Sequence, residues 1–600
     1  MTDQTSWRKS SQNLMPGYIS EETHNRYDIY PAMHLTDNLL NAGFDKLAER
    51  LATCQILIID GYSGVYFEEF RARLNEVFLQ TGVKTTWYNV SEALKSTLDI
   101  EELVAPFLGE EDPLFGKRTT LNLPHFFDQD KLQQIKPDAD IQLNIMYGCG
   151  ASLAGWQGTL VYIDLPKNEI QYRSRAGSIS NLGTVEVIDP KAFYKRCYFV
   201  DWVVLNRHKQ QILPKVDIFI DSQRPGDPVW MEGDTLRESL HTMALNVFRV
   251  RPWFEPGAWG GTWMLDHLEG LSREVPNYAW SFELIAPENG LLLESSGIRF
   301  EISFDSLMFL EGKAVLGDCF QRFGTEFPIR FDFLDTFDGG NLSIQCHPRP
   351  EYMKSHYGES FTQEETYYIL DTKDKADVFL GFCDDIDPSA FRCELEESYR
   401  SSKPVDIEKY VQKHAASKHD LFLIPSGTIH GSGKNNLVLE ISSTPYIFTF
   451  KMYDWLRPDL DGKPRPLNIQ RGMENLYFDR KGSYVKERLI AKPVLLEEGE
   501  DWKFFHLPTH LSQLYDVHRY HFHTEIEVET HDKCHVLSLV EGKSILVETG
   551  NGFSQQYNYA ETFIIPAAAG HYKIINLADG EAMLVKAFVR SGLGELGNRK

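Results

Sequence analysis

The sequence has no apolar run long enough to cross a membrane, and its first residues, Met-Thr-Asp-Gln-Thr-Ser-Trp-Arg-Lys-Ser, lack the apolar stretch of a secretion signal. Its eight cysteines are scattered singly, without a C-x-x-C pair. Single cysteines without pairing or metal-binding spacing are typical of reduced thiols. Together these absences predict a cytoplasmic protein that does not contact a membrane.

Positive charge is also scarce, since 61 Lys and Arg stand against 86 Asp and Glu, giving a net charge of −25. This balance argues against nucleic acid and acidic lipid surfaces as partners. A small anionic substrate remains compatible, because a few local basic residues can hold a phosphate. The sequence contains no low-complexity tract and no short-period repeat. The oligomeric state stays open.

A chain of 600 residues exceeds one hydrophobic core, and its texture predicts three domains. Residues 1–245 alternate apolar strands with helical stretches such as 67–79, which predicts an α/β layer. Residues 246–494 contain short strands separated by Gly, Pro and Asp turns, a pattern typical of a β-sandwich or jelly roll. A polar stretch at 406–416 is expected to form a helical insert there. Residues 495–600 predict a second, smaller β domain.

The segment Leu-Ser-Ile-Gln-Cys-His-Pro is the most informative part of the sequence. In a strand, residues i and i+2 share a face, so Gln345 and His347 point the same way. Glu365 begins a later strand, and His430 follows a Pro-Ser-Gly turn. Two imidazoles, a carboxylate and an amide oxygen suit a divalent ion such as zinc.

Six short motifs occur in the central region: Trp-Gly-Gly-Thr at 259–262, Ser-Phe-Glu at 281–283, Leu-Ser-Ile-Gln-Cys-His-Pro at 342–348, Glu-Thr-Tyr-Tyr at 365–368, Pro-Ser-Gly-Thr-Ile-His at 425–430 and Tyr-Asp-Trp at 453–455. In their order and spacing they resemble type I phosphomannose isomerase (mannose-6-phosphate isomerase), a metal-dependent enzyme of the cupin superfamily. The resemblance spans residues 252–472. It implies an aldose–ketose isomerase that interconverts mannose 6-phosphate and fructose 6-phosphate.

The resemblance also implies a ligand set and one zinc ion per chain. The family's metal ligands correspond to Gln345, His347, Glu365 and His430. Glu364 is a rival for Glu365, since a shift of one residue moves a strand side chain to the other face. Glu365 is favoured because it stands directly before Thr-Tyr-Tyr. Without the family's spacing, Gln345-x-His347 would be two ordinary polar strand residues.

Several candidate substrate residues follow from the same comparison. Lys451 stands where the family has a catalytic arginine, and in strand 446–453 it shares the face of residues 447, 449 and 453. We therefore expect Lys451 to stabilise charge or transfer a proton near the sugar. Glu440 is a candidate for substrate binding or for contact with a ligand histidine, although a salt-bridge role is the plainer interpretation. Phosphate contacts could come from Arg457, Arg465 or Arg471, and we take Arg457 as the candidate.

The C-terminal region has its own metal-like pattern. His521-Phe522-His523 has the H-x-H spacing of metal cupins, and His518 and His571 lie in the same domain. The usual glutamate spacing is absent, and the second cupin of the family normally holds no metal. Residues 495–600 are therefore expected to be structural.

The N-terminal region resembles a nucleoside-kinase-like protein in one loop only. Residues 58–64, Ile-Ile-Asp-Gly-Tyr-Ser-Gly, look like the opening of a P-loop, but the Gly-Lys-Ser/Thr that would reach a phosphate is missing. We expect a degenerate kinase-like domain without nucleotide turnover. Besides the isomerase, two functions stay open: a non-catalytic sugar-phosphate-binding or sensor protein, and a bifunctional enzyme that phosphorylates its own sugar.

Overall fold

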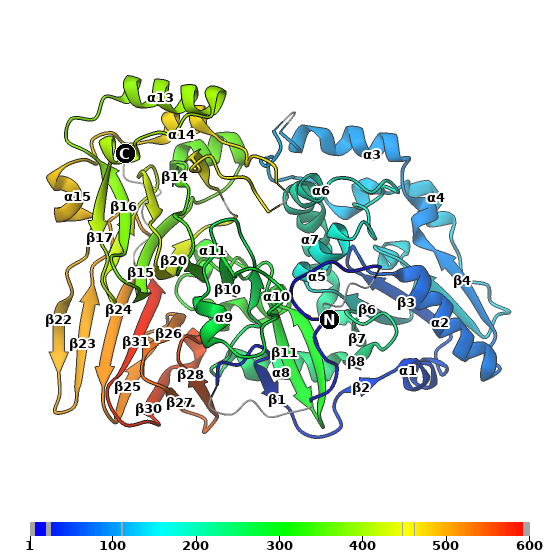
Figure 1. Cartoon of the computed structure of the whole chain (residues 1–600). Coiled ribbons are helices and arrows are strands. Elements are labelled where there is room, and N and C mark those ends of the chain that lie inside the picture. Colours follow the sequence, from blue (N-terminus) through cyan, green and yellow to red (C-terminus); the bar gives the residue numbers. More distant parts are fainter. Residues whose placement is uncertain (1–5, 20–25, 110–111, 447, 461, 592–600) are drawn as a thin grey trace. The chain divides into compact units, whose positions relative to one another are not determined.

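The computed structural model describes residues 6–19, 26–109, 112–446, 448–460 and 462–591. Their fold is multidomain and rich in β-sheet, and it divides into two compact units. The first unit combines Met1–Glu22, Tyr30–Ala244 and Pro287–Gly312, and the second combines Thr23–Ile29, Leu245–Ala286 and Lys313–Lys600. Figure 1 traces the elements of both units.

The first unit is built on a seven-stranded sheet in the order β2-β8-β7-β6-β3-β5-β4. The five strands from β7 to β4 are parallel. β8 pairs with β7 in the antiparallel sense, and β2 pairs with β8 in the same way. The strands are β2 (Asn41–Ala42), β3 (Ile56–Gly61), β4 (Thr85–Asn89), β5 (Leu143–Tyr147), β6 (Thr159–Asp164), β7 (Ile218–Asp221) and β8 (Val229–Glu232). This sheet confirms the α/β layer predicted from the alternating pattern.

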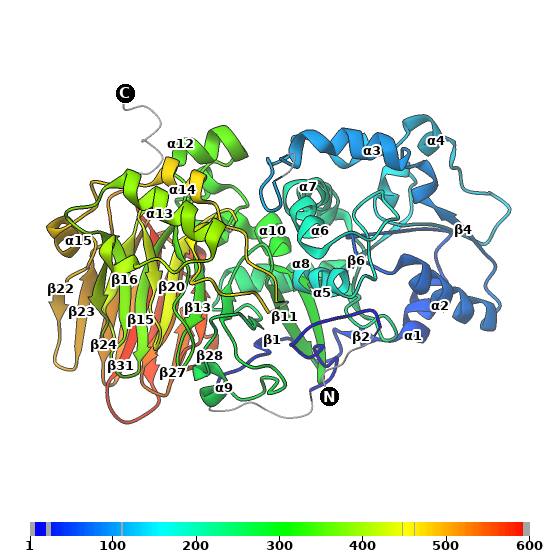
Figure 2. The ribbon, with the colours of Figure 1, turned by 45° about the horizontal axis from the view of Figure 1, so that its top comes forward.

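Helix α2 (Phe67–Gln80) confirms the helix predicted over 67–79. It buries Phe70, Leu74 and Phe78, which recur every fourth residue along one face. From β3, the chain passes through α2 to β4 at one edge of the sheet. From β6, it passes through α7 (Trp202–Ile212) to β7, which lies in the opposite direction along the sheet. Because such crossovers are right-handed, α2 and α7 lie on opposite faces of the sheet, as Figure 2 shows.

The remaining helices of the first unit connect its strands. They are α1 (Phe44–Leu51), α3 (Thr97–Val104), α4 (Gln129–Gln134), α5 (Lys167–Arg175), α6 (Pro190–Arg196) and α8 (Gly233–Ala244). A small separate sheet joins β1 (Ala32–His34) to the hairpin of β11 (Gly290–Ser295) and β12 (Ile298–Ser303). This hairpin belongs to the first unit, although the sequence pattern groups it with the central strands. The three domain boundaries remain predictions.

The second unit contains two β-sandwiches, in agreement with the predicted series of short strands. One sheet of the first sandwich has the order β18-β15-β20-β13-β10-β9, with β9 (Trp253–Glu255), β10 (Trp280–Leu284), β13 (Arg330–Asp335), β15 (Glu364–Thr372), β18 (Leu421–Ile424) and β20 (Asn436–Ser443). The other has the order β17-β16-β19-β14-β21, with β14 (Ile344–Cys346), β16 (Asp377–Phe382), β17 (Val411–Ala415), β19 (His430–Ser432) and β21 (Phe450–Tyr453).

The predicted helical insert over 406–416 is wrong. That segment contains a short 3-10 turn followed by β17, whose backbone pairs with β16. The helix lies earlier, as α13 (Pro388–Ser401). Asp387 caps it by accepting hydrogen bonds from the backbone N–H groups of Ser389 and Ala390, and Pro388 occupies the first helical position. These residues mark the start of the helix in the sequence, whereas residues 406–416 have a polar composition but no Asp-Pro pair.

The strand predicted over 446–453 is shorter than expected. β21 begins only at Phe450, and position 447 lies outside the described residues. Phe448, Phe450 and Met452 are fully buried, whereas Lys451 is partly exposed. The predicted separation of an apolar face from the face of Lys451 therefore holds for the described part of the strand.

The second sandwich pairs the sheet β22-β23-β24-β31-β26-β29 with the sheet β25-β30-β27-β28. Its strands are β22 (Val494–Glu498), β23 (Trp502–Leu507), β24 (Tyr515–Phe522), β25 (Glu525–Glu529), β26 (His535–Glu541), β27 (Ser544–Thr549), β28 (Ser554–Asn558), β29 (Thr562–Ile565), β30 (His571–Asn576) and β31 (Ala582–Val589). Apolar side chains from both sheets, among them Phe522, Leu537, Val547 and Ile574, form one buried core.

The helices of the second unit lie at the ends of strands or between them. Besides α13, they are α9 (Trp263–His267), α11 (Phe320–Phe323), α12 (Pro350–Tyr352), α14 (Ile469–Asn475) and α15 (Ser483–Arg488), while the residues of α10 (Phe304–Leu316) are divided between the two units. In Figures 1 and 2, α13 and α14 lie over the same end of the first sandwich. The sandwich carries the predicted metal ligands on its inner strands.

Candidate metal centre

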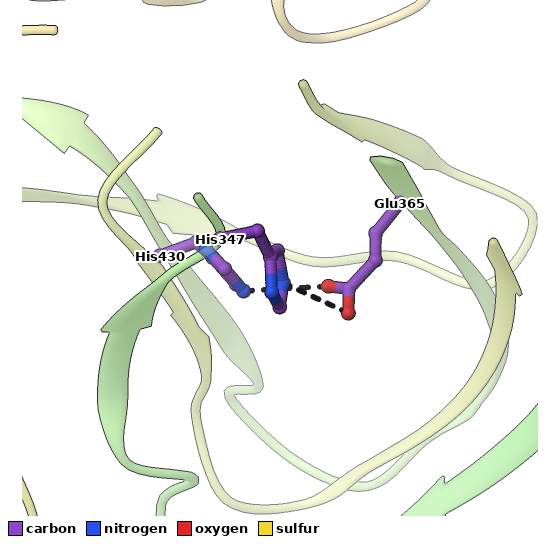
Figure 3. A group of neighbouring side chains, drawn as sticks. All are labelled: His347, Glu365 and His430. Carbon is purple, nitrogen blue, oxygen red and sulfur yellow. Dashed lines mark ion pairs between the residues drawn. The ribbon is translucent and has the colours of Figure 1, made fainter. Parts of the chain in front are cut away.

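Three of the predicted ligands meet inside the first sandwich. Figure 3 shows the carboxylate of Glu365 facing the rings of His347 and His430. Glu365 Oε1 lies 2.9 Å from His347 Nε2, and Glu365 Oε2 lies 3.3 Å from His430 Nε2. All three side chains are buried. They come from both sheets, because Glu365 belongs to β15 whereas His347 follows β14 and His430 begins β19.

Backbone contacts orient both imidazoles in the same way. His347 Nδ1 lies 2.9 Å from the carbonyl oxygen of Phe448, and His430 Nδ1 lies 2.9 Å from that of Thr428. A carbonyl oxygen only accepts, so each Nδ1 carries the hydrogen. In the neutral form of each ring, the lone pair of Nε2 is therefore directed at the Glu365 carboxylate, which also offers only lone pairs.

This convergence leaves buried acceptors without donors. Neither His347 Nε2 nor Glu365 Oε2 has a hydrogen-bond partner of acceptable geometry. A buried polar atom without a partner costs about 1–3 kcal/mol. A divalent ion between the three side chains would satisfy all of these lone pairs at once, and imidazole nitrogen with carboxylate oxygen is a donor set that zinc accepts. The residues therefore fit the metal that the sequence predicts.

The fourth predicted ligand, Gln345, lies beside this group. It pairs directly with His430 across β14 and β19, so the two side chains share a face. Gln345 Nε2 lies 3.3 Å from His430 Nε2, and Gln345 Oε1 accepts a hydrogen bond of 2.8 Å from Ser343. The amide oxygen and nitrogen can exchange places by rotation, since the hydroxyl of Ser343 can accept as well as donate. After that rotation the oxygen would face the same centre.

The structure separates Glu365 from its rival Glu364. Glu364 points to the other face of β15, where its carboxylate accepts hydrogen bonds from the backbone N–H of Ser426 at 3.0 Å and from the hydroxyl of Ser426 at 2.9 Å. Glu364 thus holds the turn that carries His430, whereas Glu365 faces the imidazoles. The register of β15 places them so, as the sequence analysis preferred.

Burial and charge act against each other in this group. Burial alone would raise the pKa of Glu365, but the electrostatic attraction of the adjacent His347 imidazole outweighs burial and holds that pKa below its usual range. Burial lowers the pKa of His430. Burial also opposes protonation of His347, yet Glu365 outweighs it and raises the pKa of that imidazole. The carboxylate is therefore the anionic member of the set.

Two residues of the site were not predicted from the sequence. Gln363 Nε2 donates a hydrogen bond of 2.5 Å to Glu365 Oε1, and its own oxygen accepts from the backbone N–H of Phe448. Tyr367 lies two residues beyond Glu365 on the same strand, with its ring 5.9 Å from that of His430 and its buried hydroxyl without a hydrogen-bond partner. The i+2 spacing from Glu365 was the only signal for either residue.

Lys451 lies directly opposite Gln345 in the pairing of β14 with β21. Residues directly opposed in an antiparallel pair project to the same face of the sheet. Lys451 therefore shares the face of Gln345, which places its charge on the side of the candidate metal centre.

Glu440 is buried on β20 and lies opposite both Tyr367 and Asp332 in the sheet. Burial, followed by the negative charges of Glu365 and Asp332, raises the pKa of Glu440 well above its usual range. Glu440 is thus a neighbour of the ligand carboxylate.

The candidate phosphate arginines have structural partners. Arg457 Nη2 donates to Asp454 Oδ1 at 2.8 Å and to the carbonyl of Asn341 at 2.9 Å. Arg465 is buried and also binds Asp454, through Nη2 at 2.6 Å and through Nε. The Tyr-Asp-Trp motif is therefore fixed by two guanidinium groups that converge on one carboxylate.

The loop that resembles a P-loop in the first unit is occupied by the protein's own groups. Asp60 is fully buried and accepts from the backbone N–H groups of Gly61, Gly150 and Ser152. A Cβ at Gly64 would lie 3.3–3.4 Å from apolar side chains of α5 and its surroundings. The loop is packed as a structural turn, and its kinase-like character remains a prediction.

Two further expectations concern the whole chain. All eight cysteines, which fall within the described residues, are unpaired, and Cys346 is buried between the candidate ligands Gln345 and His347. Within the same described ranges, no helix has the length and apolar character needed to cross a membrane.

Comparison with known proteins finds one family model and several curated relatives. Residues 43–245 match a family model described as a domain of unknown function (DUF8485). Mannose-6-phosphate isomerase ManA of Bacillus subtilis is 26% identical over 224 residues, which cover 37% of this chain and 66% of that protein. The probable mannose-6-phosphate isomerase GmuF of Bacillus subtilis is 26% identical over 251 residues, covering 42% of this chain and 73% of that protein.

The chain thus spans about two thirds of the length of these curated relatives. Among solved structures, the mannose 6-phosphate isomerase of Bacillus subtilis aligns with a TM-score of 0.44 and 20% identity, covering 57% of this chain and 99% of that one. A zinc-bound mannose 6-phosphate isomerase aligns with a TM-score of 0.43 and 14% identity, covering 56% of this chain and 98% of that one. The sequence matches therefore make part of this chain similar to mannose-6-phosphate isomerases.

Proposed function

We propose that this protein is a metal-dependent aldose–ketose isomerase that interconverts mannose 6-phosphate and fructose 6-phosphate. The observation that carries the proposal is the convergence of two imidazole lone pairs on the buried carboxylate of Glu365. The sequence similarity to mannose-6-phosphate isomerases supports it. The partner is a small sugar phosphate, and nucleic acid is not expected to bind a chain with a net charge of −25.

Gln345, His347, Glu365 and His430 would hold one zinc ion. When bound, such an ion polarises a carbonyl oxygen and stabilises charge on neighbouring oxygens, which contributes several kcal/mol. Gln363 and the carbonyls of Phe448 and Thr428 orient three of the ligands through hydrogen bonds. Contacts of this kind fix ring orientation and tune ligand basicity.

The reaction moves one proton between neighbouring carbons of the sugar through an enediol. We assign Lys451 to this step, because it shares the face of Gln345 and carries the positive charge that the family places on an arginine. It would stabilise the negative charge that develops on a sugar oxygen, or transfer the proton itself. A positioned acid or base typically contributes about 10²–10⁴-fold in rate.

Glu440 and Arg457 are proposed for supporting roles. Glu440 would act through the neighbouring Glu365, whose negative charge it faces. Arg457 would contribute to the binding of the phosphate, with Asp454 fixing its guanidinium. An Arg457→Lys variant tests the second role: a higher KM for mannose 6-phosphate with an unchanged kcat would support it, whereas an unchanged KM would remove Arg457 from the phosphate site.

The direct test is a coupled assay for fructose 6-phosphate formed from mannose 6-phosphate. Protein stripped of metal should be inactive, and zinc should restore turnover. Zinc binding with sugar-phosphate binding but without turnover would instead identify a sensor. Consumption of ATP with free mannose would point to the bifunctional enzyme, and its absence is the expected result for a first unit whose loop is filled by its own side chains.

A further inference from the structure

A second group of metal-binding side chains lies in the second sandwich. His506 is on β23, and Asp516 and His518 are on β24. His506 lies directly opposite His518, and Asp516 is two residues before His518, so all three project from the same face of the sheet. One nitrogen or carboxylate oxygen from each lies within 4.8 Å of the others.

The polar contacts within this group are incomplete. His506 Nε2 lies 3.0 Å from both carboxylate oxygens of Asp516, one of which also accepts from Thr509 Oγ1 at 3.0 Å. His518 Nδ1 is buried and has no hydrogen-bond partner. An imidazole nitrogen left in this state is costly unless a cation or a donor reaches it.

Neighbouring side chains hold the ring of His518 in place. The rings of Phe504 and Phe588 lie 4.9 and 4.8 Å from it, both in edge-on arrangements. A ring packed between two aromatic side chains keeps its orientation, which is what a ligand residue needs in order to bind a metal without a large loss of side-chain entropy. The group is therefore organised before any ion arrives.

Two basic residues lie nearby and set the expected affinity. Arg590 Nη2 is 3.8 Å from Asp516 Oδ1, and Lys586, which pairs with His518 across β24 and β31, donates to the hydroxyl of Tyr520 at 2.8 Å. The positive charge of Arg590, and that of Lys586 in its protonated form, oppose the approach of a cation. The carboxylate of the first centre is buried between two imidazoles, whereas the carboxylate of Asp516 also lies beside Arg590, so the second group should bind the same ion more weakly.

We propose that His506, Asp516 and His518 form a second binding site for a divalent transition-metal ion. Two imidazoles with one carboxylate are a donor set for zinc or iron(II), and such sites keep positions open for water or an oxygen ligand. This site is independent of the proposed isomerase centre. The sequence pattern that drew attention to this region, His521-x-His523, does not contribute: His521 contacts Glu581, and His523 is exposed.

Metal stoichiometry tests the proposal with the full chain. Protein stripped by a chelator and reloaded with zinc should retain about two equivalents, and a His347→Ala variant should retain one. The double variant His347→Ala/His518→Ala should retain no zinc. His518→Ala alone should retain the one zinc equivalent that binds more tightly, at the first centre. Cobalt(II) in place of zinc gives a spectroscopic readout that does not depend on activity.

The matched control is His571→Ala, which removes an exposed histidine of the same sandwich and should keep both equivalents. Because His518→Ala could disturb the packing of its aromatic neighbours, Asp516→Asn provides a second variant that preserves the side-chain shape. Loss of the weaker equivalent in both variants, with unfolding transitions like that of the control, is the expected result. Retention of the same metal content in both variants, or a single equivalent in the unmutated protein, would overturn the proposal.

Discussion

Glu364 and Glu365 are consecutive residues of β15 whose carboxylates face opposite sides of the strand. Glu365 lies within 3.3 Å of two imidazole nitrogens, whereas Glu364 accepts hydrogen bonds from Ser426 in the turn before His430. The same strand therefore supplies a candidate ligand on one face and fixes the position of another ligand from the opposite face. This arrangement gives two adjacent variants with different expected consequences.

Glu365→Gln should abolish tight zinc binding at the first centre and reduce isomerase activity by at least about 100-fold, because it removes the anionic ligand. Glu364→Gln should keep the zinc and most of the activity, and lower the free energy of unfolding by about 1 kcal/mol through its weakened bonds to Ser426. Metal analysis, steady-state rates and denaturant unfolding of the two variants check this. Equal zinc loss in both would contradict the assignment of Glu365 alone.

Lys451→Ala should lower kcat by about 10²–10⁴-fold while zinc content stays unchanged, because the side chain shares the face of Gln345 without being a ligand. Lys451→Arg should restore a large part of the activity, since it supplies the charge at the position where the resemblance places an arginine. Lys451→Gln controls for side-chain length. If Lys451→Ala keeps its rate, a different residue carries this step.

Asp335 gives a prediction about pH. Its buried carboxylate accepts from the backbone N–H of Met264 at 2.9 Å and of Phe337 at 3.0 Å, and burial raises its pKa to about 7. Between pH 4 and 7 the folded state then holds a proton that the unfolded state has released, so the stability of the second unit should fall as pH rises through this window. The full effect is on the order of a few kcal/mol.

An Asp335→Asn variant should lose this part of the pH dependence, because an amide does not ionise. The control is Asp338→Asn, a nearby substitution that removes an exposed carboxylate paired with Lys373. It should keep the dependence of stability on pH that the unmutated protein shows. Thermal unfolding of all three proteins between pH 5 and 8 gives the comparison. An identical slope in Asp335→Asn would show that this carboxylate stays ionised.

Much of the fold could be predicted from the sequence, because local patterns decided it. The helix over 67–79 carries its own periodicity, and the structure has it within a residue. The helix predicted over 406–416 failed because polar composition was weighed above the helix cap at Asp387, and because β17 is fixed by its pairing with the distant strand β16. The membership of β11 and β12 in the first unit depends on pairing with β1, which no local pattern reveals.

The candidate site was predictable where spacing within a strand fixes the face. The shared face of Gln345 and His347 follows from that rule, whereas Glu365 was preferred to Glu364 for its place directly before Thr-Tyr-Tyr. The structure brings Gln345, His347 and Glu365 together with His430. The orienting carbonyls of Phe448 and Thr428 and the bond from Gln363 could not be predicted, because they depend on contacts between separate strands. The group of His506, Asp516 and His518 was missed for the same reason, since it needs the register of β23 with β24.

The most direct measurement is the rate of fructose 6-phosphate formation from mannose 6-phosphate while zinc is titrated into stripped protein. We predict that activity rises in proportion to zinc and reaches a plateau when the tighter site is filled, and that His430→Ala shows no such rise. Activity that persists in the stripped protein, or a titration of His430→Ala that matches the unmutated chain, would contradict the claim that His347, Glu365 and His430 form the metal centre of an isomerase.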